Sequence, residues 1–262
     1  MSATLDTGIP HAARIYNYVL GGKDNFQADR DAGDAMMAAG PLLAPSMRAN
    51  RKFMTRVGRH LAEQGFTQYL DLGTGLPLSP NLHETVQQII PAADVVYVDN
   101  DPLVLTHARA LLREVPGATG RLGYIEADLR EPDSIFSDDS VTGVLDLSRP
   151  LAVTIIAMLQ LVGDEDARRV VADILARLAP GSALVISTVV PDQDPAGVEQ
   201  IISAAARTGL TLHARTPGQV LALMDGLRIA DPGLVPVHRW RPDEPVDPDV
   251  RIGMYGALGI KP

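Results

Sequence analysis

A glycine turn and three carboxylates of this sequence could together bind a nucleoside. Residues 71–77 read DLGTGLP directly after a short apolar run, and Gly73 and Gly75 let the backbone turn sharply with no Cβ facing a ligand. Asp99 closes a second apolar run, where a carboxylate can accept two hydrogen bonds from a ribose diol. Asp128 follows a third such run and could reach an adenine amino group. Each signal alone is often structural, so the argument depends on their common order along the chain.

These residues can meet only if the apolar runs are neighbouring parallel strands. Runs that fit strands alternate with helical patterns from residue 68 onward, which favours a parallel sheet with helices on both faces. The predicted strands cover 68–72, 95–98, 122–125, 152–158 and 183–189, and the predicted helices between them cover 80–90, 102–112 and 165–178. Because the carboxyl ends of such strands line one crevice, the sequence predicts an α/β fold with the site at that edge.

Helical patterns precede the first predicted strand, and strand-like runs close the chain. The helical patterns cover 12–20, 27–39 and 46–65, and the closing runs cover 227–230, 234–240 and 254–260. No linker-like segment or internal repeat divides the sequence. We therefore expect one structural domain, in which residues 1–66 form an N-terminal helical extension or lid and residues 67–262 form the core.

The composition excludes several classes of protein and site. The chain has no cysteine, so a disulfide scaffold, a thiolate metal site and a cysteine nucleophile are excluded. None of the six histidines has metal-ligand spacing, and we expect no metal. A net charge of −9 disfavours a nucleic-acid partner. The N-terminus carries no signal pattern and the longest apolar stretch, 150–162, is too short to cross a bilayer, so we expect a cytoplasmic protein without a membrane partner. The sequence is silent on oligomeric state.

The glycine turn argues against a dinucleotide. A dinucleotide site needs G-x-G-x-x-G, and Leu78 stands at the third glycine position. Proline and leucine in this turn would crowd a pyrophosphate at the helix N-terminus. The turn therefore favours a nucleoside ligand without pyrophosphate, such as S-adenosylmethionine, while an NAD-dependent oxidoreductase stays as an alternative.

The motifs resemble those of a known family. The stretch 71–75 followed by VDNDP at 98–102 looks like the first two motifs of class I methyltransferases, and ARIYNYVLGGKDNF at 13–26 resembles the signature of an actinobacterial family of S-adenosylmethionine-dependent methyltransferases. Further similar stretches lie at 148–150, 179–182, 232–236 and 239–242, so the resemblance covers nearly the whole chain. It implies a Rossmann-like fold whose mostly parallel, seven-stranded sheet has helices on both faces and an antiparallel last strand.

The resemblance also implies which residues hold the cofactor, S-adenosylmethionine. The glycine turn would hold the methionine side, Asp99 the ribose hydroxyls, and the residues after the third strand the adenine. The implied cofactor-binding residues are Asp71, Gly73, Thr74, Gly75, Asp99, Asn100, Asp128 and Leu129. The hinge at 21–26 does not fit a phosphate loop, and we expect it to fold over the crevice with Lys23 or Arg14 near the cofactor carboxylate. The alternative is an exposed turn between two helices.

Catalytic residues are harder to assign, because methyl transfer chiefly needs an aligned nucleophile and needs a base only if the acceptor must lose a proton. His11, which precedes the expected lid, and Tyr16 are the candidates. Gln160 stands where many relatives are expected to carry histidine. The chain lacks a D/N-P-P-Y/F motif and cysteine, which leaves O- or N-methylation of a small molecule as the predicted activity. A catalytically silent regulatory protein that binds S-adenosylmethionine is the main alternative.

Overall fold

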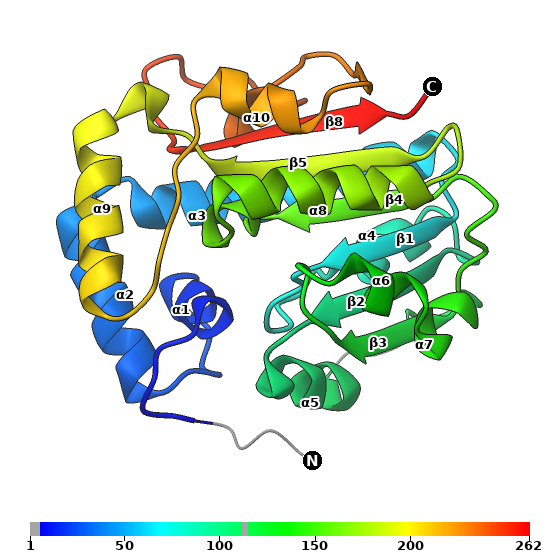
Figure 1. The fold of residues 1–262 in the computed structure, drawn as a ribbon, viewed down its shortest axis with the longest axis horizontal. Helices are drawn as coiled ribbons and strands as arrows, with labels where there is room; N and C mark the ends of the chain where they lie inside the picture. Colours follow the sequence, from blue (N-terminus) through cyan, green and yellow to red (C-terminus); the bar gives the residue numbers. More distant parts are fainter. Residues whose placement is uncertain (1–5, 112–114) are drawn as a thin grey trace.

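A mostly parallel sheet forms the centre of the computed structural model, which describes residues 6–111 and 115–262. Its strands follow the order β3-β2-β1-β4-β5-β8-β6, and β1 to β5 run parallel (Figure 1). The last strand, β8, inserts antiparallel between β5 and β6. The strands are β1 (Gln68–Leu72), β2 (Asp94–Asp99), β3 (Leu122–Glu126), β4 (Ala152–Ile156), β5 (Ala183–Val189), β6 (Arg228–Ile229), β7 (Val235–Pro236) and β8 (Met254–Ile260).

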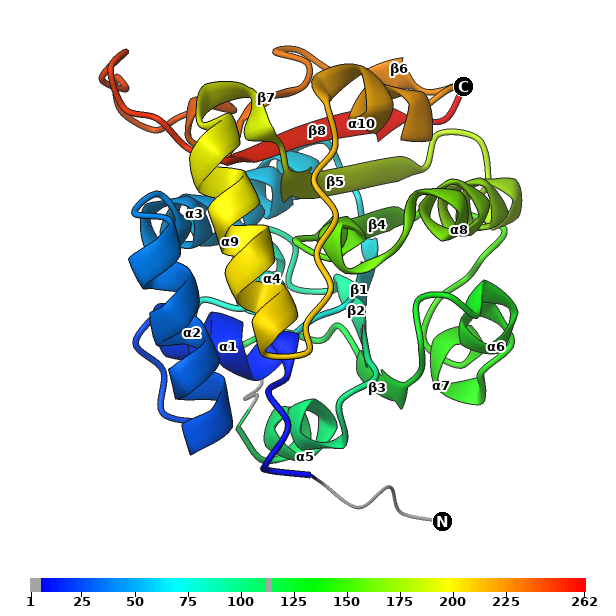
Figure 2. The ribbon, with the colours of Figure 1, turned by 60° about the vertical axis from the view of Figure 1, so that its left-hand side comes forward.

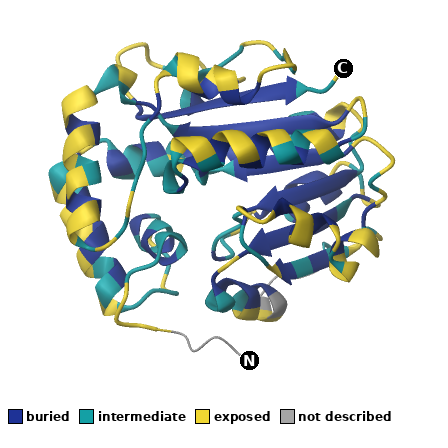
Figure 3. Ribbon diagram, in the orientation of Figure 1, coloured by how far each residue is buried: buried dark blue, intermediate teal, exposed yellow. Residues whose placement is uncertain are grey.

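Helices cover both faces of this sheet (Figure 2). One face carries α3 (Leu43–Glu63), α4 (Leu82–Gln87) and α5 (Pro102–Leu111), and the other carries α6 (Pro132–Phe136), α7 (Asp139–Thr142), α8 (Asp164–Arg177) and α10 (Pro217–Leu223). Successive strand residues point to opposite faces, so Tyr69 packs with Phe53 of α3 while Leu70 packs in the cluster that contains Val170 of α8. Figure 3 shows the central strands almost entirely buried, which explains their nearly unbroken apolar runs.

The predicted α/β class I fold is confirmed, with four local corrections. The described part of the sheet has eight strands, because the short β7 also pairs with β8. Strand β4 ends at Ile156 and not at residue 158, because Ala157 adopts a φ of +56°. Helix α4 begins at Leu82 and not at residue 80, because Asn81 is its N-cap residue and donates its amide hydrogen to the Glu84 carboxylate at 2.6 Å. The predicted strands at 227–230 and 234–240 shrink to two residues each, and residue 112 of one predicted helix lies outside the described residues.

Three helices lie at the carboxyl ends of the parallel strands. They are α1 (Ala12–Val19), α2 (Gln27–Ala39) and α9 (Pro195–Arg207) (Figure 1). An apolar cluster joins Ile15, Met36 and Leu43 of the N-terminal segment to Ala204 and Ala205 of α9. The helices α1 and α2 are thus held by a helix from the far half of the chain.

The hinge between α1 and α2 is built on one buried amide. The Asn17 carboxamide oxygen accepts hydrogen bonds from the Asp24 amide at 3.1 Å and from the Asn25 side chain at 3.0 Å. The Gly22 amide donates to the Asn17 carbonyl at 2.8 Å, and a Cβ on Gly22 would lie 2.3 Å from Asn17 Nδ2. Glycine is therefore required at Gly22 by close approach.

We expect Gly22→Ala to unfold at a lower temperature than the wild type. The new methyl group forces apart a hydrogen-bonded hinge, which costs about 1–3 kcal/mol and lowers the melting temperature by roughly 2–10 °C in a chain of this size. Differential scanning calorimetry measures this. Gly218→Ala, where a Cβ meets nothing within 4 Å, is the control and should melt at or above the wild-type temperature. Equal melting of Gly22→Ala and wild type would contradict the packing argument.

Candidate functional site

A cavity of about 520 Å³ lies where the carboxyl ends of β1, β2, β3 and β4 face α1. Its walls come from the loops after these strands, from the segment 10–20 and from α3. This volume falls within the range of roughly 300–1,000 Å³ that small-molecule sites occupy. The strand order reverses between β1 and β4, and the cavity lies at the carboxyl ends of both strands, as the crevice rule for doubly wound sheets requires.

The glycine turn after β1 leaves backbone open to this cavity. Gly73 and Gly75 have φ angles of +78° and +69°, in the left-handed region that favours glycine. A Cβ on Gly73 would collide with Met158 at 2.2 Å, whereas a Cβ on Gly75 would meet no atom within 4 Å. Because Gly75 lines the cavity, its missing side chain leaves space that a ligand can use.

Asp99 is fixed between the glycine turn and the start of α5. Its Oδ2 accepts the Gly75 amide hydrogen at 2.8 Å, and its Oδ1 accepts the Asp101 amide hydrogen at 2.9 Å. Burial raises the pKa of the Asp99 carboxyl. Each carboxylate oxygen keeps a further acceptor position, so Asp99 can accept a pair of hydroxyl groups from a molecule in the cavity.

The cavity wall carries a buried acid, Asp71, and a half-buried cation, Arg51, and both are incompletely paired. The carboxylate of Asp71 accepts a short hydrogen bond from the Thr154 hydroxyl, and burial raises the pKa of Asp71. Arg51 of α3 donates through Nη2 to the carbonyl oxygens of Leu78 and, at 2.8 Å, of Pro80. Its Nε is buried and has no hydrogen-bond partner among the described residues, and burial lowers the pKa of Arg51. These two groups suit the ammonium and carboxylate of an amino acid.

The far end of the cavity is closed by the loop after β3. Asp128 lies on this wall, and hydrogen bonds from the Arg130 guanidinium at 2.6 and 3.0 Å lower the pKa of its carboxyl. Leu129 is buried beside it and Asn100 is exposed at the rim. An apolar side chain next to hydrogen-bonding groups suits a planar heterocycle.

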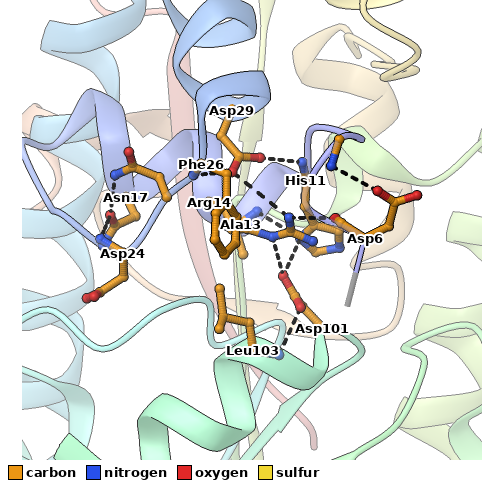
Figure 4. Close-up of polar contacts among 12 residues, drawn as sticks. Asp6, His11, Ala13, Arg14, Asn17, Asp24, Phe26, Asp29, Asp101 and Leu103 are labelled. Carbon is orange, nitrogen blue, oxygen red and sulfur yellow. Dashed lines mark hydrogen bonds and ion pairs between the residues drawn. The ribbon is translucent and has the colours of Figure 1, made fainter. Parts of the chain in front are cut away.

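A buried ion pair fastens the N-terminal segment over the cavity (Figure 4). Arg14 Nε and His11 Nδ1 lie 2.9 and 3.2 Å from the same oxygen of Asp101, which follows β2. On the α2 side, Asp29 accepts the backbone amide hydrogens of His11 at 2.9 Å and of Phe26 at 2.8 Å. Since the Asp101 amide also binds Asp99, the lid segment and the end of β2 form one hydrogen-bonded unit.

The structure brings most of the residues chosen from the sequence to this cavity. Eight of the nine residues predicted to bind cofactor line it, as do His11 and Tyr16. The ninth residue, Lys23, is exposed and does not line the cavity, and Arg14 is engaged with Asp101. The hinge that carries Lys23 thus matches the alternative of an exposed turn at that residue.

Tyr16 is engaged in structural hydrogen bonds. Its hydroxyl donates to the Met47 carbonyl oxygen at 3.0 Å and accepts from the Asn50 side chain at 3.1 Å. Burial raises the pKa of Tyr16, which disfavours the phenolate. Tyr16 therefore contributes to the wall of the cavity but is poorly suited to accept a proton.

Sequence reasoning missed Arg51. The signal was present, because Arg51 follows Met47 by four residues and precedes Met54 by three, which places a charge on the apolar face of a helix. A charge at such a position needs a partner or a ligand.

No helix in residues 6–111 and 115–262 is long and apolar enough to cross a membrane. Within the same residues, no cluster of three or more His, Asp or Glu side chains could hold a metal ion.

Comparison with known proteins gives a family match over the full length. A family model described as S-adenosyl methyltransferase matches residues 1–262. A DUF574 family protein from Streptomyces avermitilis is 44% identical, with a TM-score of 0.93 over 98% of this chain and 99% of that one. A structure from Thermobifida fusca that carries a provisional methyltransferase name is 39% identical, with a TM-score of 0.90 over 98% and 96% of the two chains.

A more distant structure shares the fold alone. Human N-acetylserotonin methyltransferase in complex with SAM is 16% identical, with a TM-score of 0.53 over 97% of this chain and 63% of that one. The search of curated proteins finds no match.

Proposed function

The chain belongs to the S-adenosyl methyltransferase family, and we propose that this enzyme binds S-adenosylmethionine in the cavity at the carboxyl edge of its sheet. One observation carries the assignment of the site: the cavity wall combines a half-buried cation whose buried Nε has no partner among the described residues, a buried acid, and a glycine where a Cβ would enter open space. Arg51 and Asp71 would hold the carboxylate and ammonium of the methionine moiety. Gly75 would let the ligand approach the backbone.

The remaining residues would hold the nucleoside. Asp99 would accept hydrogen bonds from the ribose hydroxyls. Asp128, Leu129 and Asn100 would contact the adenine at the next strand end. This order follows the sheet outward from β1 to β3, so the proposed contacts require no rearrangement of the strands.

The chemistry needs little from the protein beyond alignment. When bound, S-adenosylmethionine supplies an electrophilic methyl group: a lone pair on oxygen or nitrogen of the acceptor forms the new bond, the C–S bonding pair stays on sulfur, and S-adenosylhomocysteine is released. The acceptor's proton must pass to a base, and we propose His11 for this role. Its Nδ1 lies 3.2 Å from Asp101 Oδ2 and 3.4 Å from the Ala13 amide nitrogen, and these two contacts orient the ring at the cavity wall. The helices α1 and α2, and not α3, which packs on the face of the sheet, would act as the lid that excludes water from the reaction.

The site assignment is tested by melting the purified protein with S-adenosylhomocysteine, S-adenosylmethionine or NAD. Ligand at about 100 times its dissociation constant should add roughly 2.7 kcal/mol, a rise in melting temperature of roughly 5–10 °C. We expect this rise with the first two ligands and none with NAD. If the protein is folded and its melting temperature does not rise with S-adenosylhomocysteine, the proposed cofactor site is refuted. Transfer of labelled methyl groups into a cell extract then distinguishes an enzyme from a silent binding protein.

A further inference from the structure

A second, smaller cavity adjoins the proposed cofactor site. It has a volume of about 90 Å³ and lies among α1, α3, α9 and the loop after α9. Its wall is made mainly of aliphatic and methionine side chains, among them Ile15, Met36, Met47, Val198, Ile201 and Leu212. We call it the apolar chamber.

The polar groups on the wall of the apolar chamber are mostly engaged already. The Ser46 hydroxyl accepts the Gly253 amide hydrogen at 2.9 Å, and the Gln160 side chain donates to the Ala157 carbonyl at 2.6 Å. The Asp194 carboxylate caps α9 by accepting the Gly197 amide hydrogen at 3.1 Å. No lysine or arginine is among the described lining residues. Asp194 and His213 are the only acidic or basic side chains among the described lining residues, so a charged ligand group placed away from these two would lose its hydration without gaining a counter-ion.

The apolar chamber meets the cofactor cavity at the end of β4. Five residues line both: Ala12, Tyr16, Ala157, Leu161 and Leu210. Ala157 has the left-handed φ of +56°, which its amide supports by donating to Ser187 O and Ser187 Oγ, both at 3.0 Å. Strained backbone of this kind is kept only where surrounding contacts enforce it, and it is frequent at functional sites. Here it places an alanine, with a small side chain, at the junction of the two cavities.

We propose that the apolar chamber receives an uncharged aliphatic group of the methyl acceptor, and that the acceptor's nucleophile is a hydroxyl oxygen at this junction. The inference rests on the proposed function of the larger cavity. About 90 Å³ equals the volume of roughly three water molecules in the liquid, which suits a branched group of about three to five carbon atoms. A hydroxyl is favoured over an amine because an aliphatic amine is protonated near neutral pH and would carry its charge into the apolar junction.

The methionines of this chain permit a test that reads the two cavities separately. Met36, Met47 and Met254 line the apolar chamber, whereas Met54 and Met158 line the cofactor cavity. Protein labelled with 13C at the methionine methyl groups is titrated with S-adenosylhomocysteine and then with 3-methylbutan-1-ol. Signals are assigned with single Met→Leu variants. We expect the first ligand to shift Met54 and Met158, and the alcohol to shift Met36, Met47 and Met254 in a saturable way.

Charged isosteres decide the ligand class. We expect 3-methylbutanoate and 3-methylbutylammonium to bind the apolar chamber about tenfold more weakly than the alcohol, or worse. Equal or tighter binding of either ion would overturn the inference, and both ions are strict probes because Asp194 could pair with the ammonium and His213 could bind the carboxylate. If S-adenosylhomocysteine shifts the Met54 and Met158 signals but the alcohol shifts no methionine signal of the apolar chamber, the inference is overturned while the proposed cofactor site is supported. No shift with S-adenosylhomocysteine would refute the proposed function itself.

Variants of Leu212 test whether the apolar chamber is where the alcohol binds. Leu212→Trp should fill the space and weaken the alcohol's effect about tenfold or more, while Leu221→Trp on the exposed surface of α10 should leave it unchanged. Leu212→Ala should enlarge the chamber and favour 5-methylhexan-1-ol over 3-methylbutan-1-ol by about fourfold for each added methylene that becomes buried. If both Leu212 variants bind both alcohols like the wild type, the chamber does not receive the alkyl group.

Discussion

Replacing Asp99 with asparagine is expected to weaken S-adenosylhomocysteine binding by about 10²- to 10⁴-fold, since two hydrogen bonds to a charged acceptor contribute about 1.5–3 kcal/mol each. The amide is also a poor substitute inside the protein. Asp99 accepts backbone N–H groups from Gly75 and Asp101 on its two oxygens, so the amide NH₂ of the variant would face one of these donors. Isothermal titration calorimetry measures the loss.

The matched control for Asp99→Asn lies on the same strand. Asp94 is at the opposite end of β2, where it pairs with Arg121 on the surface. Asp94→Asn should bind S-adenosylhomocysteine within about twofold of the wild type. If Asp99→Asn stays folded and loses less than about threefold in affinity, less than one ordinary hydrogen bond is involved and its assignment to the ribose is wrong.

The same carboxyl makes the affinity depend on pH. Burial raises the pKa of Asp99, and the ligand needs the ionised form. As the pH falls, affinity should therefore begin to drop above the ordinary aspartate range near about pH 3.9. Burial also raises the pKa of Asp71, which contributes in the same direction. The contribution of Asp99 is therefore the difference between the pH dependence of affinity in the wild type and in Asp99→Asn.

Arg51→Met is expected to weaken S-adenosylhomocysteine binding by about 10- to 100-fold, because a charge-assisted hydrogen bond to the methionine carboxylate is lost. The nucleoside part of the ligand provides the discriminating measurement. Binding of 5′-methylthioadenosine, which lacks the amino-acid group, should be nearly unchanged in Arg51→Met and strongly reduced in Asp99→Asn. Equal losses for both ligands in Arg51→Met would show a general disturbance of the 78–81 loop, to which Arg51 donates.

A control on the same helix isolates the buried charge. Arg59 is two turns further along α3 and pairs with Asp243 at the surface, outside both cavities. Arg59→Met should bind S-adenosylhomocysteine like the wild type, within about twofold. If Arg59→Met loses as much affinity as Arg51→Met, the long-range electrostatic attraction of the positive charges on α3 accounts for the effect, and not a direct contact of Arg51 with the ligand.

The sequence by itself determined the sheet and the cofactor edge of the cavity. Alternating strands and helices dictate parallel pairing, and the carboxyl ends of parallel strands meet at one edge. The residues at the carboxyl ends of β1, β2 and β3 therefore had to converge, as Asp71, Asp99 and Asp128 do. These predictions succeeded because each residue lies within a few positions of a strand whose place in the sheet is set by local pattern.

Only the tertiary structure decided what faces that edge. Arg51 reaches Asp71's cavity because α3 packs across the sheet, and α9 closes the apolar chamber from the far half of the chain. The hinge turns Lys23 to solvent, although its sequence is compatible with a position over the crevice. Such contacts join segments that are distant in sequence, and their geometry follows from how helices pack on one another. No local pattern of residues encodes that packing.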